Sequence, residues 1–71
     1  MCESEVTVKY RNKQEKFEEV IQIHIKGNSL TIVCLGGKMK TFTGFAGISL
    51  FNANFLSHRI EIDLVGEVNV I

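Results

Sequence analysis

The sequence predicts an all-β protein with a single domain over residues 1–71. Val, Ile and Thr together number 19 against 2 alanines, and side chains branched at Cβ are stiff and pack well on a pleated sheet. Apolar and polar residues alternate along several short stretches, which is the pattern of half-buried strands. The length allows one small core, since a chain of this size buries only about 60% of the surface that its unfolded form exposes.

The first half of the chain carries the clearest alternation. Residues 6–10 alternate between apolar and polar side chains and predict a strand, after which the polar run at 11–16 is expected to turn the chain. A second strand is predicted at 21–26, where isoleucines alternate with polar side chains, although residues 17–22 also suit a helical turn.

Two glycine-containing turns divide the middle of the chain. The Gly-Asn pair at 27–28 predicts a tight hairpin, because both residue types accept the positive φ that such a turn requires. A third strand follows at 29–35. The Gly-Gly pair at 36–37 predicts a second tight turn. A less regular fourth strand is predicted at 38–45, in which Gly44 is expected to mark a bend or bulge.

The last third predicts a short fifth strand at 47–51, a turn at 52–57, a sixth strand at 58–64 and, at 67–71, an alternating tail that would add an edge strand. Six short strands joined by tight turns predict a small antiparallel barrel of the SH3-like kind, with a compact sandwich as the alternative. The barrel is favoured because closure hides strand edges that so small a sheet does not otherwise cover.

Charge, hydropathy and cysteine content exclude several classes of function. The 8 basic and 8 acidic side chains, with a pI near 6.7, lack the basic excess of a strongly nucleic-acid-binding domain. No apolar run approaches the roughly 20 residues needed to cross a bilayer, and the first residues do not resemble a signal peptide. Two cysteines 32 positions apart match neither a disulfide scaffold nor a zinc-ligand spacing. We therefore expect a cytoplasmic protein without a membrane partner and, since nucleophile and phosphate-loop motifs are missing, one that is not an enzyme.

Cys2 is the residue whose position points to chemistry. If Met1 is removed, the α-amine and thiolate of Cys2 form a five-membered chelate ring around a metal. If Met1 stays, its amine joins the amide nitrogen and thiolate of Cys2 in a similar planar set. Nitrogen with thiolate in a square plane suits Ni(II) or Cu(II), whereas zinc favours a closed tetrahedral site. One chain supplies too few donors, so the site would need a homodimer; the alternative is that Cys2 is an ordinary residue near a frayed end.

The other reactive side chains favour structural interpretations. Cys34 falls in phase with Leu30 and Ile32, so we expect it in the core. The histidines, His24 and His58, have no neighbouring ligand in sequence and are expected to be solvated, with a pH-responsive or metal-supporting role as the alternative. Paired carboxylates are expected on a solvated face rather than in acid–base chemistry. These pairs are Glu18 with Glu19 and Glu61 with Asp63.

Cations gather in two places: Lys9, Arg11, Lys13 and Lys16 around the first turn, and Lys38 and Lys40 further along. Such groups suit phosphate contacts. Aromatic side chains for stacking bases are scarce, because Tyr10 is expected to face the core and Phe17 and Phe51 remain as surface candidates. A small RNA-binding or protein-interaction module is therefore the alternative function, and nucleic acid is not the expected partner.

Four segments form a recognisable set: MCESEVTV at the start, EEVIQIHIKGNSLTIVCL with its Gly-Asn turn, the Gly-Gly turn after it, and NFLSHRIEIDL near the end. In this combination the chain resembles, over residues 1–64, the CooT family of small β-barrel proteins associated with nickel delivery to carbon monoxide dehydrogenase. Some of its members are labelled predicted RNA-binding proteins. The tail at 65–71 and the segment EKFEEV depart from the family pattern. The dimer surface of this chain can therefore differ from the one the resemblance implies.

The resemblance implies a homodimer that binds one Ni(II) per pair of chains, with Cys2 of each chain as a ligand. Together with the chelating position of Cys2 and Met1, it predicts a nickel-binding accessory protein. The expected client is a nickel enzyme such as carbon monoxide dehydrogenase.

Overall fold

The all-β prediction is confirmed by the computed structural model, which describes residues 4–71. The strands are β1 (Ser4–Tyr10), β2 (Lys13–Lys26), β3 (Ser29–Cys34), β4 (Met39–Thr43), β5 (Gly47–Asn54), β6 (Arg59–Val65) and β7 (Asn69–Val70). The last of these confirms that the alternating tail adds an edge strand. The turn predicted at 52–57 is shorter than expected, because residues 52–54 continue β5.

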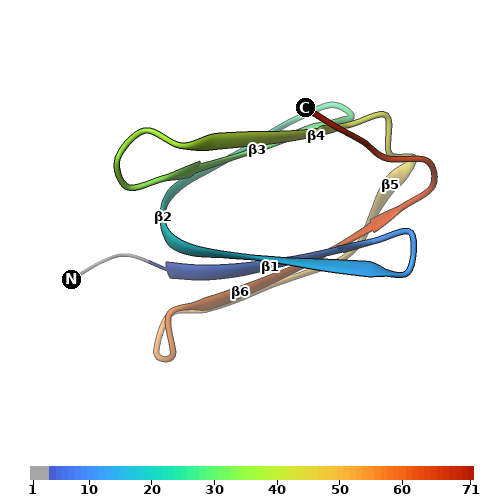
Figure 1. Cartoon of the computed structure of the whole chain (residues 1–71). Coiled ribbons are helices and arrows are strands. Elements are labelled where there is room, and N and C mark those ends of the chain that lie inside the picture. The colour runs from blue at the N-terminus through green and yellow to red at the C-terminus, as the bar shows by residue number, and fades with distance from the viewer. Residues whose placement is uncertain (1–3) are drawn as a thin grey trace.

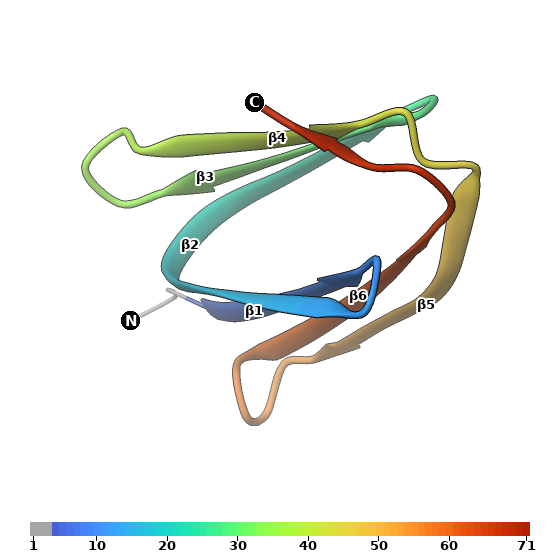
Figure 2. The ribbon, with the colours of Figure 1, turned by 45° about the vertical axis from the view of Figure 1, so that its right-hand side comes forward.

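The strands form one sheet in the order β5-β6-β1-β2-β3-β4-β7. Neighbouring strands are antiparallel, except that β1 and β6 run parallel. The links at 44–46 and 66–68 are short, although each joins strands that stand far apart in this order. The sheet is therefore rolled into two layers (Figures 1 and 2). The lower layer contains β5, β6, β1 and the first part of β2, and the upper layer contains the rest of β2 with β3, β4 and β7.

Strand β2 joins the two layers. Its first part pairs with β1 as far as Val20, and its second part pairs with β3 from Val20 to Lys26. The register against β3 shifts at Ile21, and Glu19 has a positive φ of 57°. Irregularities of this kind bend a strand and increase its twist, so one continuous strand passes from the lower layer to the upper one (Figure 1).

The core lies between the layers and follows the predicted alternation. Its buried residues are Val6, Val8, Val20, Leu30, Ile32, Phe42, Phe45, Ile62, Leu64 and Val68. No polar or charged side chain within residues 4–71 is buried, so apolar packing holds the layers together. The rings of Tyr10 and Phe17 meet Phe42 edge to face, with centroids 5.3 and 6.0 Å away, an arrangement that the aromatic quadrupole favours.

The prediction of a closed antiparallel barrel of about six short strands is wrong in its details. The sheet has seven strands and one parallel pair, and within residues 4–71 its edges β5 and β7 do not pair with each other. The polar run at 11–16 turns the chain, as predicted, but only at Arg11 and Asn12, both with positive φ, because β2 begins at Lys13. A mixed-charge run suits a strand there, since one side of β2 pairs with β1 while the other forms a free edge.

Candidate functional site

The two predicted metal ligands, Cys2 and Met1, lie outside the described residues. The first described residue, Ser4, begins β1. The backbone N–H of Glu5 donates to the carbonyl of His58 over 2.9 Å, which anchors the start of β1 beside the turn between β5 and β6.

An apolar hollow adjoins the start of β1. Ser4 lies opposite Val20 and lines this hollow of about 240 Å³ together with Ile21, Ile23 and Ile60. Ile21 is 56% exposed, so its apolar surface is uncovered within the described chain. The hollow thus gives the start of β1 an apolar surface with room for another molecule.

The remaining predicted ligands do not come together. Both histidines are exposed, as expected, and the carboxylates are exposed or, for Asp63, half-buried. Within residues 4–71 no group of three or more His, Cys, Asp or Glu side chains is placed to hold a metal ion. One Asp63 oxygen, Oδ1, is buried without a hydrogen-bond partner.

Cys34 packs against the core but is half-buried rather than fully enclosed. Its position at the end of β3 explains the difference, because the chain leaves the layer there at the Gly36–Gly37 turn. With Phe17 and Met39 it lines a hollow of about 230 Å³ between β2 and the β3–β4 hairpin. The thiol is free, so it remains open to substitution without loss of a disulfide.

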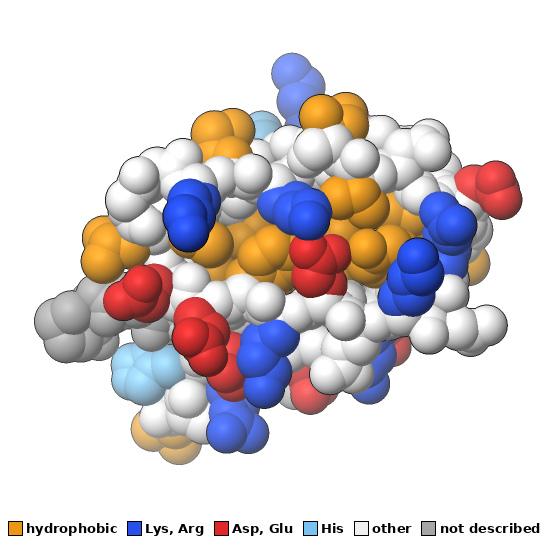
Figure 3. All heavy atoms as spheres, viewed as in Figure 1, with side chains coloured by type: hydrophobic (Ala, Val, Ile, Leu, Met, Phe, Trp, Pro, Cys, Tyr) orange, Lys and Arg blue, Asp and Glu red, His pale blue; other side chains and the backbone are white. Residues whose placement is uncertain are grey.

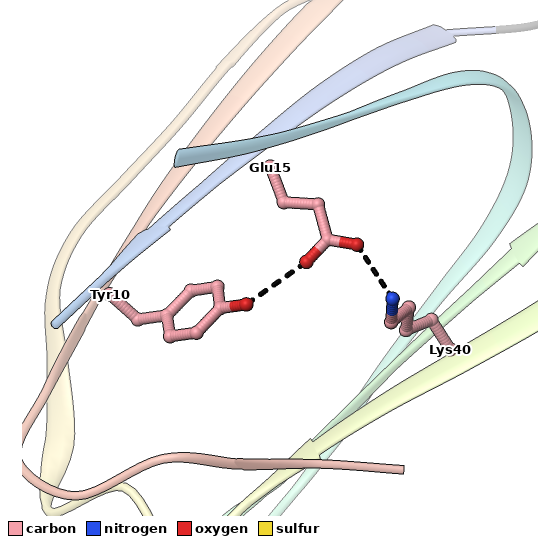
Figure 4. A network of polar contacts seen from close by, with 3 residues as sticks. All are labelled: Tyr10, Glu15 and Lys40. Carbon is pink, nitrogen blue, oxygen red and sulfur yellow. Dashed lines mark hydrogen bonds and ion pairs between the residues drawn. The ribbon is translucent and has the colours of Figure 1, made fainter. Parts of the chain in front are cut away.

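A polar network that the sequence did not predict bridges the two layers (Figure 4). The Tyr10 hydroxyl donates to Oε1 of Glu15 over 3.0 Å, and Nζ of Lys40 donates to Oε2 over 2.7 Å. Glu15 lies opposite Val8 and Lys40 lies opposite Ile32 in their strand pairs, so both point to the core side of the sheet. The signal for the network was present in the sequence as polar residues in phase with core positions.

These contacts shift the protonation of all three groups. The hydrogen bond from Lys40, followed by the one from Tyr10, lowers the pKa of Glu15 below 4.5. The same contact with Glu15 raises the pKa of Lys40 above 10.5. Burial and the bond to Glu15 raise the pKa of Tyr10 above 10.0. Near neutral pH the network therefore holds the Glu15 carboxylate between the Lys40 ammonium and the Tyr10 phenol. These contacts link β2 to β4 across the two layers.

Some of the predicted cationic side chains form ion pairs or hydrogen bonds within the protein. Lys16 lies 3.7 Å from Glu5, and Nη1 of Arg11 donates to the carbonyl of Val68 over 3.0 Å. Three of the cations around the first turn line a shallow hollow of about 660 Å³ that Asp63 also lines, namely Lys9, Arg11 and Lys13. Figure 3 shows Lys and Arg side chains interspersed with acidic ones along an apolar band between the layers. This mixture gives the face no extended positive region.

The aromatic predictions have mixed outcomes. Tyr10 packs against the core, as expected, and Phe51 is exposed. Phe17 is not a surface aromatic, because its ring packs against Phe42. Phe55, in the turn after β5, is 77% exposed. Phe51 and Phe55 are therefore the exposed aromatic side chains within residues 4–71.

Comparisons of the chain with family models, with curated proteins and with solved structures gave no match. The part of the chain that the structure describes contains no helix long and apolar enough to span a membrane.

Proposed function

We propose that the protein is a nickel-binding accessory protein. Two chains form a homodimer in which Cys2 thiolates and the neighbouring backbone nitrogens hold one Ni(II). The metal is cargo, delivered to or used in the maturation of a nickel enzyme such as carbon monoxide dehydrogenase. The proposal includes a cytoplasmic setting and no catalytic step.

The observation that carries the proposal is the position of Cys2. It stands two residues before Ser4, which lines the apolar hollow together with Ile21, Ile23 and Ile60. A second chain covering this surface would remove apolar area from water and bring a second thiolate nearby. Nitrogen and thiolate donors in one plane match the geometry that Ni(II) prefers, and the resemblance over residues 1–64 supports the same ligand.

The chemistry of loading follows from the thiol. A free cysteine has a pKa near 8.5 and must lose its proton to bind the metal. Nickel uptake therefore releases protons, and acid returns the metal to solution. Such a site suits reversible transfer of the ion.

The test compares the two cysteines. Nickel is titrated anaerobically into the full chain, into Cys2→Ser and into Cys34→Ser, while absorption spectra and sedimentation are recorded. We expect one nickel per two chains with thiolate-to-nickel charge-transfer bands in the parent protein and in Cys34→Ser, and neither in Cys2→Ser. Unaltered stoichiometry and spectra in Cys2→Ser would show that the proposed site is wrong.

A further inference from the structure

One long segment of the chain carries no charge. Residues 41–57 include neither a basic nor an acidic side chain, so all 16 charged residues lie before or after this segment. It contains the whole of β5 and most of the turn that leads to β6. Since most side chains of β5 and of this turn are exposed, the missing charge is a property of the surface there.

Strand β5 is an edge of the sheet. Within residues 4–71 it pairs with β6 along its length and has no partner on its other side. A free edge presents a row of backbone N–H and C=O groups that can pair with another chain, and proteins usually blunt such edges with charges or proline. Strand β5 has neither, and its one irregularity is a shift of register against β6 between Ile48 and Leu50.

The other long free edge shows the usual protection. Along residues 13–19 of β2, which precede its pairing with β3, five of the seven side chains are charged. The edge of β4 is covered in part by β7, through the pairs of Phe42 with Val70 and Thr43 with Asn69. Among these three described strands, β5 is the one whose free edge has neither charged side chains nor a covering strand.

Apolar side chains stand on both faces of β5. Leu50 lies opposite Asp63 and therefore faces outward, whereas Phe51 lies opposite the fully buried Ile62 and faces the core side. Even so, Leu50 is 41% and Phe51 is 50% exposed. A strand placed beside β5 would contact an apolar side chain on each of its own faces.

The turn after β5 extends this surface. Phe55 is 77% and Leu56 is 96% exposed. The side-chain Oδ1 of Asn54 accepts hydrogen bonds from the backbone N–H of Leu56 over 3.0 Å and of Ser57 over 3.1 Å. Because these bonds fix the backbone of the turn, the two apolar side chains are displayed at a defined position next to the end of the edge.

We propose that the free edge of β5 is a docking site for an extended segment of a partner protein, which adds to the sheet as a further strand. Its backbone pairs with β5, and its apolar side chains, present on both of its faces, contact Leu50 on one face and Phe51 on the other. Phe55 and Leu56 anchor the segment at its end. The segment is uncharged over about eight residues, since a charged side chain there would lose water without gaining a counter-ion.

The size of the surface favours a peptide segment over a second copy of this chain. Eight residues at about 3.4 Å each make an edge about 27 Å long, which with a sheet about 10 Å thick offers on the order of 300 Å². A stable protein–protein interface buries about 800 Å² on each partner. The edge therefore fits a transient complex with an extended segment, and the proposal is independent of nickel binding.

The test uses the full chain, labelled with ¹⁵N, and an eight-residue synthetic peptide of threonine and valine with valines on both faces of the extended strand. We expect saturable amide shifts concentrated at 47–56, and none from the same peptide with proline at two central positions. The double variant Leu50→Lys/Asn52→Lys should bind at least tenfold more weakly. Its lysines would lie opposite Asp63 and Glu61, so folding should persist, as the unchanged remainder of the spectrum would show.

A matched variant, Gln14→Lys, adds a cation on the outward face of β2 and should bind the peptide like the parent protein. Three results would overturn the proposal: no saturable shift up to millimolar peptide, shifts centred on residues 13–19, or equal binding by the double variant. A doubled mass in sedimentation, with β5 shifts that vanish on dilution in the absence of peptide, would identify a second copy as the occupant instead.

Discussion

Gly66→Ala should destabilise the protein more than Gly37→Ala, although the two glycines have similar φ values of +98° and +91°. A Cβ at Gly66 would lie 3.1 Å from both the Cβ and the backbone nitrogen of Ala46, whereas a Cβ at Gly37 would meet nothing within 4 Å. Ala46 cannot easily withdraw, because its N–H donates to the carbonyl of Val65 over 2.6 Å. Gly37→Ala therefore measures backbone strain alone. Gly66→Ala measures backbone strain together with crowding between the link at 66–68 and the link at 44–46.

The expected losses follow from these two terms. A side chain at positive φ costs about 1–2 kcal/mol at either position, and overpacking adds about 1–3 kcal/mol at Gly66. Gly66→Ala should therefore lose about 2–5 kcal/mol of unfolding free energy and Gly37→Ala about 1–2 kcal/mol. In a domain of this size each kcal/mol lowers the Tm by about 4–8 °C.

Urea unfolding and thermal melting, both followed by circular dichroism, measure this difference. The slope of unfolding free energy against urea should be the same in the parent and both variants, because the surface exposed on unfolding does not change. Equal losses in the two variants would refute the reasoning. They would mean that the link at 66–68 moves away from Ala46 at little cost and does not hold the rolled sheet rigidly.

Other consequences are open to measurement. Because its pKa is lowered in the folded protein, Glu15 contributes stability above about pH 4.5 that is lost as the pH falls; Glu15→Gln should flatten acid unfolding in this range, and an unchanged pH profile would exclude this role. Nickel affinity should fall steeply below neutral pH if the Cys2 thiol must ionise, and a flat profile between about pH 6 and 8 would contradict that requirement. Cys34→Ser should cost about 1 kcal/mol in urea unfolding, because the site is half-buried; a loss several times larger would show that the thiol is packed more tightly. Sedimentation at micromolar concentration should give twice the chain mass, and a monomer with and without nickel would oppose the shared site.

The sequence predicts the donor atoms of the candidate metal site but not the surface around it. The position of Cys2 in the sequence suggests nitrogen and thiolate donors, and this remains a prediction because Cys2 lies outside residues 4–71. The apolar hollow beside Ser4 could not be foreseen, since it depends on Ile60 lying near residues 21–23. The network of Tyr10, Glu15 and Lys40 likewise joins residues from β1, β2 and β4, and no local pattern indicates which polar side chains will meet.

The sequence by itself determined which residues form most strands and which side chains face inward. Alternation at 6–10, 29–35 and 58–64 is a local property, and burial of its apolar members follows from removing them from water. The hairpin at Gly27 and the edge strand in the tail are also local, because turn chemistry and alternation act over a few residues.

Only the tertiary structure decided the order of the strands, the parallel pair of β1 and β6, and the open edge of β5. These features depend on contacts between residues some 50 positions apart, such as Val8 with Ile62, which no short pattern encodes. Residues 13–16 show the same limit, because their polar side chains are typical of a turn until β1 supplies a pairing partner on one side. Whether a strand is central or at an edge is a property of its neighbours, so the exposed, uncharged edge of β5 emerges only once the sheet is assembled.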